Sequence, residues 1–149
     1  MKTIAEAAVL ASLAERLERL TPAQSRVWGT MSAQQMAVHL GDGAEAALAR
    51  RPFTATNRPG SRVLKWIALR LPLPWPHGIR SGADPAAREI PAESFPADRE
   101  RALRTLQEVA AAPEGALADR HPIFGPMSRS DWHRWAFLHT DHHLRQFGL

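Results

Sequence analysis

Three of the seven histidines lie within five positions of one predicted helix, at His139, His142 and His143. His139 and His143 are four residues apart, so an α-helix places them one turn apart on the same face, where both can bind one ion. Imidazole nitrogens are common protein ligands for zinc, nickel, copper and iron. This pair therefore predicts a metal-binding site.

A third ligand is expected from another helix, because a catalytic metal site typically uses three protein ligands and leaves a position for water or substrate. His39 is the natural candidate, since it lies between Met36 and Leu40 on the predicted core-facing side of its helix. Inward-facing residues on separate helices meet inside a bundle, and bundle interiors commonly hold metal ions. The competing interpretation is that these histidines are hydrogen-bonded core residues, because buried polar groups are normally paired.

Neighbouring side chains could assist or replace these ligands. His142 lies about 60° from His139 on a helical wheel and is an alternative to either member of the pair. Asp42, one turn after His39, is expected either to orient an imidazole or to be a solvated surface carboxylate. Gln146 faces inward, where it either lines a pocket or bonds a loop carbonyl.

The other polar and aromatic candidates are given structural roles. Asp141 points outward and is expected at the surface, whereas His77 and His121 lie beside prolines and are expected in turns. Trp132 and Trp135 are expected in the core rather than in a substrate-binding surface. No residue is assigned a catalytic role.

The elements that must position these residues are helices, because apolar residues repeat at intervals of three and four along most of the sequence. Capping-box sequences begin two of them, at Ser32 to Gln35 and at Ser128 to Asp131. No segment shows the alternation typical of strands, so the sequence predicts an all-α bundle that forms one domain over 1–149. The predicted helices cover 3–20, 32–50, a short segment at 61–71, 97–112, and a last helix between Ser128 and Gly148.

Two segments are expected to shape the site. On the last helix, the sector that contains the tryptophans becomes a histidine face, while Asp131, His133 and Arg134 point away from it. Segment 72–96 contains six of the twelve prolines and is predicted to be a long loop. Long loops in compact domains often cover functional sites.

The composition narrows both the chemistry and the partners. Without cysteine or tyrosine, the chain has no disulfide, thiolate ligand or cysteine nucleophile, and proton transfer falls to His, Asp, Glu, Lys or water. The pI of 10.9 accompanies a net charge of only +4, because the basic residues are mostly non-titrating arginine. These residues are scattered, so no nucleic-acid partner is expected. No apolar run is as long as a membrane span, and a cytoplasmic protein with no membrane partner is expected.

Four motifs together resemble the DinB-like superfamily, and in particular its small single-domain bacterial members. The similarity extends from the first predicted helix to the C-terminus, although the specific motifs occupy a small part of the chain. The motifs are Met36-x-x-His39-Leu40, His121-Pro-Ile-Phe-Gly125, Trp132, and His139-x-x-His142-His143-x-x-Gln146-Phe-Gly148.

This resemblance implies a four-helix bundle with a long crossover connection, often dimeric, that holds a divalent metal through three histidines. In this sequence the matching residues are His39, His139 and His143. Characterised members of the superfamily include thiol-dependent S-transferases and isomerases that use low-molecular-weight thiols. The proline-rich segment departs from the superfamily pattern and no thiol-binding signature is evident, so the reaction does not carry over.

The sequence therefore predicts a metal-dependent enzyme that acts on a small molecule and forms a homodimer. A thiol-dependent S-transferase or a hydrolase-type activity fits the expected site. Zinc or nickel suits imidazole ligation, and iron is a further candidate. The alternative is a helical-bundle protein without catalytic activity that binds a metal or a small ligand, or one whose histidines have lost their function.

Overall fold

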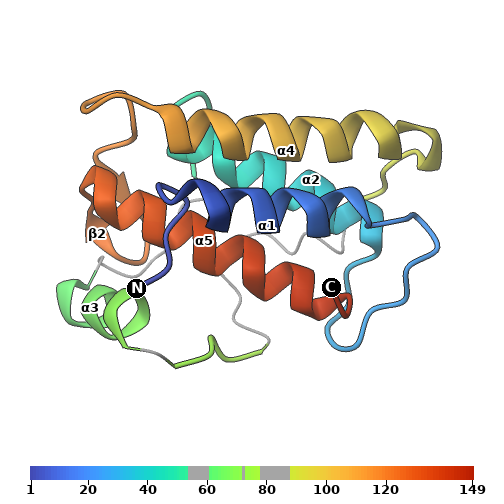
Figure 1. Ribbon diagram of the computed structural model, residues 1–149, viewed down its shortest axis with the longest axis horizontal. Helices are drawn as coiled ribbons and strands as arrows, with labels where there is room; N and C mark the ends of the chain where they lie inside the picture. The colour runs from blue at the N-terminus through green and yellow to red at the C-terminus, as the bar shows by residue number, and fades with distance from the viewer. Residues whose placement is uncertain (54–60, 72, 78–87) are drawn as a thin grey trace.

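The computed structural model describes residues 1–53, 61–71, 73–77 and 88–149, and it is mostly helical (Figure 1). Beside the α-helices, the described residues form a 3₁₀ turn, η2 (Ala92–Ser94), and a short antiparallel pair of strands, β1 (Arg120–His121) and β2 (Gly125–Pro126). The α-helices are α1 (Ala7–Glu18), α2 (Ala33–Ala47), α3 (Arg62–Arg70), α4 (Phe95–Ala111) and α5 (Arg129–Gln146).

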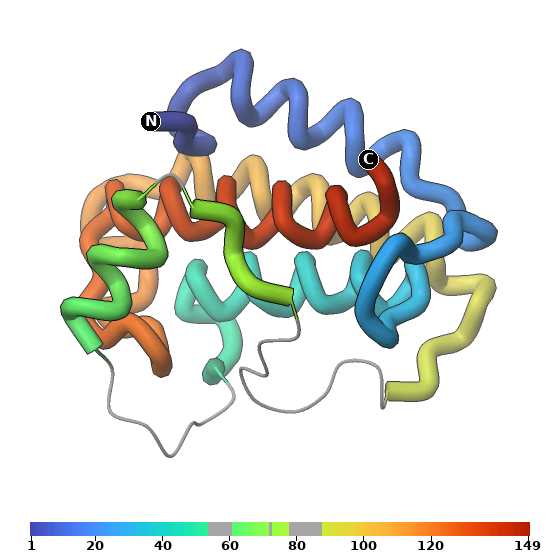
Figure 2. The backbone as a smooth tube through the Cα atoms, turned by 90° about the horizontal axis from the view of Figure 1, so that it is seen from below, coloured from blue at the N-terminus to red at the C-terminus, as the bar shows by residue number. Residues whose placement is uncertain are grey.

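Helix α5 lies at the centre of the helix packing. It contacts α1, α2, α3 and α4, while α2 also packs along α4. Figure 2 shows α5 between α1 on one side and α2 on the other. The shared core contains mainly aliphatic and aromatic side chains from these helices, including Leu13, Leu17, Met36, Leu40, Leu106, Val109, Trp132 and Leu144.

The predicted capping boxes begin α2 and α5. The Ser32 side chain accepts from the Gln35 backbone N–H, and the Gln35 side chain accepts from the Ser32 backbone N–H. Ser128 and Asp131 exchange the equivalent pair of bonds at the start of α5. These bonds satisfy backbone donors that a helix leaves free in its first turn, so they fix where α2 and α5 begin.

Two sequence predictions about the connections were wrong. The prediction of no strand misses β1 and β2, which pair because the chain reverses tightly between them and Gly125 takes a positive φ of 70°. Part of the predicted loop at 72–96 is helical, since η2 and the start of α4 lie inside it. Residues 72 and 78–87 of that loop lie outside the described part of the chain.

Three polar residues of α5 were expected to point away from the buried side of the helix, and this expectation was also wrong. Asp131, His133 and Arg134 are all buried, because helices pack against α5 on several sides. Each has polar partners: Asp131 pairs with Lys65 at 2.8 Å, and Arg134 donates to the Leu69 carbonyl at 2.9 Å. Buried polar groups require such partners, and here these bonds also attach α3 to α5.

Candidate metal centre

Helices α2 and α5 bring three histidines into one cluster, which we call the histidine triad: His39, His139 and His143. One ring nitrogen from each can be chosen so that all three lie within 4.8 Å of one another. The Nε2 atoms of His39 and His139 are 3.0 Å apart. Residues that are a hundred positions apart in the sequence therefore meet at the contact between the two helices, as their predicted core-facing positions implied.

The three rings of the triad surround a common point. Their centroids are 4.9 Å apart for His39 and His139, 4.7 Å for His39 and His143, and 4.8 Å for His139 and His143. Every pair is close to perpendicular, with interplanar angles of 64°, 80° and 85°. Metal–nitrogen bonds of 2.0–2.1 Å place two ligating nitrogens about 2.9–3.4 Å apart. The 3.0 Å between the Nε2 atoms of His39 and His139 falls in this range, and one ring nitrogen of His143 lies within 4.8 Å of a ring nitrogen of each.

Burial lowers the pKa of all three imidazoles. The pKa of His39 falls to about 4, mainly through burial and despite the opposing charge of Asp42. Burial and the neighbouring histidines lower the pKa of His139 and His143 well below the usual value. The triad is therefore neutral at pH 7, which is the protonation state that a metal ligand requires.

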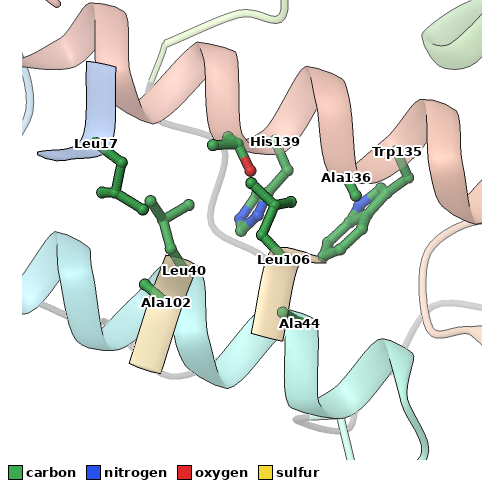
Figure 3. Close-up of a pocket in the computed structure, with 9 residues that line it drawn as sticks. Leu17, Leu40, Ala44, Ala102, Leu106, Trp135, Ala136 and His139 are labelled. Carbon is green, nitrogen blue, oxygen red and sulfur yellow. The ribbon is translucent and has the colours of Figure 1, made fainter. Parts of the chain in front are cut away.

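The position of His139 depends on Trp135 and Gly43. The Trp135 ring stacks on the His139 ring, with centroids 4.6 Å apart and planes at 13°. A Cβ atom at Gly43 would lie 3.2 Å from His139 Cε1 and 3.3 Å from Trp135 Cη2. Figure 3 shows both rings extending from α5 toward α2. Glycine at position 43 therefore gives these two rings room against α2.

A small cavity lies beside His139 on the side of the core (Figure 3). Its volume is about 10 Å³, enough for about one water molecule. The lining is almost entirely apolar, and the polar groups come from His139 and Thr140. A substrate therefore has no room to reach the triad from this side. The cavity is lined by Leu17, Leu40, Ala44, Ala102, Leu106, Trp135, Ala136, His139 and Thr140.

Next to His143 lies a second group of rings, which we call the aromatic wall: Trp28, Trp75, His77 and His142. His142 is 5.2 Å from His143 and lies 5.9–6.3 Å from the other three rings. Trp28 and His77 stack at 4.1 Å. Among the described residues, the candidate ligand group is the triad, and the alternative role of His142 as a ligand is not supported.

The structure gives Asp42 a different role from the predicted orientation of an imidazole. Its carboxylate forms ion pairs with Arg51, with Arg88 at 2.6 Å and with Arg101 at 3.1 Å. The carboxylate raises the pKa of His39 only through its charge. Asp42 thus links α2 to α4 and to the chain preceding η2, and it is neither a solvated carboxylate nor a hydrogen-bond acceptor for the triad.

Other predicted residues have structural contacts. His121 closes the turn between β1 and β2, where its Nδ1 accepts from the Ile123 N–H at 3.1 Å, so the predicted turn role is confirmed. Asp141 is half-buried and pairs with Arg16 at 2.7 Å, which corrects its expected exposure. Trp132 and Trp135 are buried in the core, as predicted.

The sequence reasoning missed two contributors, Trp28 and Gly43. Both act through contacts between segments that are remote in the sequence, and neither lies in a recognisable motif. The one available signal was that Gly43 lies on the same predicted helix face as His39. A glycine on a core-facing side leaves room for a bulky group of a neighbouring helix.

The chain matches a known protein family over most of its length. The sequence model of a family described as "Protein of unknown function (DUF1569)" matches residues 6–148. No curated protein and no solved structure matches the chain. Among the described helices, none combines the length and apolar character needed to cross a membrane.

Proposed function

The chain belongs to the DUF1569 family of proteins of unknown function, and from its own residues we propose that it is a metal-dependent enzyme acting on a small molecule. The observation that carries this proposal is the histidine triad, in which three neutral imidazoles meet at one point. Three protein ligands leave coordination positions open, which is typical of catalytic rather than structural sites.

Zinc or nickel is the metal that we propose, with iron as a further candidate, because the ligand set consists of imidazoles. When bound, such an ion supplies Lewis acidity and lowers the pKa of a coordinated water or thiol. The protein has no cysteine, so any S-transfer requires an external low-molecular-weight thiol. His39, His139 and His143 would hold the ion between α2 and α5.

The chain's own residues suggest the direction from which a substrate approaches. The cavity beside His139 has room for only about one water molecule, so a substrate cannot approach from the core side. The aromatic wall adjoins His143 and includes half-buried Trp28 and Trp75 and exposed His77. We therefore place the substrate against the aromatic wall, where ring faces provide apolar contact beside the open coordination positions.

The helix arrangement supports the proposed relationship to the DinB-like superfamily. Four long helices, α1, α2, α4 and α5, pack around a shared core, as a four-helix bundle requires. A long connection, which includes α3, separates α2 from α4 and fits the expected crossover. The same resemblance supports a homodimer.

A binding protein without turnover is the second candidate. The group that bonds His143 is the Gln146 amide, which cannot act as an acid or a base. A catalytic site would be expected to have an acid or a base there, so this contact favours binding without turnover. Incubation of metal-loaded protein with thiols and small electrophiles distinguishes the two candidates. Turnover that disappears in His39→Ala supports the enzyme, whereas tight ligand binding without turnover supports the binding protein.

Elemental analysis tests the metal site directly. The native chain, purified without an affinity tag, is compared with His143→Ala and with His133→Ala, which removes an enclosed imidazole elsewhere on α5. We expect about one metal per chain in the native protein and in His133→Ala, and none in His143→Ala. A native chain that contains no metal and gains no thermal stability from zinc or nickel would contradict the proposal.

A further inference from the structure

The last turn of α5 contains a hydrogen-bond chain that determines which nitrogen of His143 is free. Gln146 is only 4% exposed, and its Oε1 lies 3.0 Å from His143 Nδ1. Its Nε2 donates to the Trp28 carbonyl oxygen at 3.0 Å. Because a carbonyl oxygen only accepts, the amide must turn its N–H group toward Trp28 and its oxygen toward His143.

This orientation has a consequence for the imidazole. An amide oxygen facing Nδ1 can only accept, so Nδ1 of His143 carries the hydrogen and donates it. In a neutral ring the hydrogen then leaves Nε2 with a free lone pair. Metal-binding histidines usually have a hydrogen-bond partner on the second nitrogen, which fixes both the tautomer and the ring orientation.

The Trp28 carbonyl is held close to α5 by the backbone of the loop between α1 and α2. Val27 N–H donates to the Gln146 carbonyl at 2.7 Å, and Gly29 has a positive φ of 80°. A Cβ atom at Gly29 would lie 2.3 Å from Gln146 Nε2, which is closer than atoms can approach. Figure 2 shows this loop beside the C-terminal end of α5. The loop reaches Gln146 only because residue 29 has no side chain.

We propose that Gln146 is a positioning residue that fixes the His143 tautomer presenting Nε2 to a metal, and that the Trp28–Gly29 turn holds Gln146 in place. The metal part of this inference rests on the proposed function; the tautomer part does not. The loop between α1 and α2 thereby contributes to metal affinity without supplying a ligand.

The test uses the full chain and two measurements. Imidazole nitrogen NMR of the metal-free protein reports the His143 tautomer, and competition with a chelator gives the zinc dissociation constant. In the native protein we expect hydrogen on Nδ1. Gln146→Leu removes the acceptor, so we expect a mixture of tautomers and zinc binding weaker by about 10- to 100-fold. Gln146→Glu keeps an acceptor for Nδ1 but loses the donor to the Trp28 carbonyl, so we expect the native tautomer and a loss of zinc affinity smaller than that of Gln146→Leu.

Two glycines provide a matched pair for the loop. Gly29→Ala should displace the Gln146 amide and weaken zinc binding by about 10-fold. Gly115 has a similar positive φ of 81°, but a Cβ atom there meets nothing within 4 Å. Gly115→Ala therefore introduces the same backbone strain without the clash, and we expect native zinc affinity and the native tautomer.

The outcomes separate this inference from the proposed function. A native His143 tautomer and native zinc affinity in both Gln146→Leu and Gly29→Ala would overturn the positioning role. If Gln146→Leu does not fold, Gly29→Ala compared with Gly115→Ala decides the question. If the native protein binds no metal but Gln146→Leu still changes the tautomer, the metal function fails while the control of the tautomer stands.

Discussion

Two kinds of enclosed histidine lie close together in this structure, and they differ in what their nitrogens contact. His121 and His133 are 6% and 4% exposed, and each bonds a backbone group: the Ile123 N–H and the Val109 carbonyl, respectively. In the histidine triad, by contrast, the Nε2 atoms of His39 and His139 face each other.

This difference shows that burial alone does not identify a metal ligand. All five imidazoles have a lowered pKa because burial disfavours their charged form. A backbone partner completes the hydrogen bonding of a ring nitrogen, as at His121 and His133. Two ring nitrogens 3.0 Å apart form a hydrogen bond only when one of them carries a hydrogen, and a bound cation would replace that hydrogen and accept both lone pairs. The contact partner is therefore the useful criterion.

The largest expected effect comes from removing one triad imidazole. Replacing His39 or His139 with alanine should weaken zinc binding by more than about 100-fold, because removal of a ligand costs more than loss of a supporting contact. His133→Ala, the structural counterpart, should leave the zinc affinity within about 2-fold of native. Isothermal titration with zinc on untagged protein measures both. Equal losses in the two classes of variant would remove the distinction between them.

Protonation of a structural histidine should instead lower the stability of the fold at acid pH. The pKa of His121 is lowered from 6.5 to about 4 by burial, so its contribution to folding is fully present above pH 6.5 and is lost as pH falls toward 4. The shift corresponds to a loss of about 3 kcal/mol across that window.

Urea unfolding of metal-free protein at pH 7.5 and at pH 4.5 measures this loss. His121→Gln should depend less on pH than the native protein by up to about 3 kcal/mol, while its zinc affinity at pH 7.5 stays within about 2-fold. Identical pH dependence in the two proteins would show that folding leaves the pKa of His121 unchanged.

An intermediate effect is expected at Gly43, which touches the triad without bonding it. Alanine there should displace the His139 ring by a few tenths of an ångström and weaken zinc binding by about 5- to 10-fold. Gly41→Ala is the matched control on the same helix, since its Cβ would meet the end of the Arg101 side chain rather than the triad. Replacing glycine with alanine stabilises the helix by up to about 1 kcal/mol at either position. Zinc titration, rather than unfolding, therefore distinguishes the two variants.

The smallest effect is expected at Asp42, although it lies one turn from His39. Asp42→Asn should change the zinc affinity by less than about 2-fold, because its carboxylate bonds arginines. Its loss should lower the free energy of unfolding by about 1 kcal/mol or less, and salt should reduce the difference. A large loss of zinc affinity would restore Asp42 as an orienting residue for the triad.

The parts of the site that could be predicted from the sequence depend on local geometry. Helical periodicity fixes that His139 and His143 share a face and that His39 faces the core, and local side-chain to backbone bonds fix the capping boxes. Inward-facing residues of two packed helices then meet, as His39 and the pair of His139 and His143 do, although the pattern alone left His142 as an alternative ligand.

The remainder depends on contacts that no local pattern encodes. The Gln146 amide bonds the carbonyl of Trp28, 118 positions away. An inward face on the helix was equally compatible with lining a pocket and with bonding a loop carbonyl, and it did not identify the carbonyl. The polar side of α5 is buried because α3 and α4 also cover it, which a single helix does not reveal. The two short strands depend on a turn closed by His121 rather than on alternating residues.

The separation of the triad along the chain has a consequence for folding. His39 and His139 are 100 positions apart, so an ion held by both closes a loop of that length. Closing such a loop in an unfolded chain costs about 4 kcal/mol in entropy, so an unfolded chain would keep the ion on His139 and His143 alone. An ion with all three ligands would therefore act as a reversible cross-link, and its removal by a chelator should accelerate global unfolding rather than only empty a site.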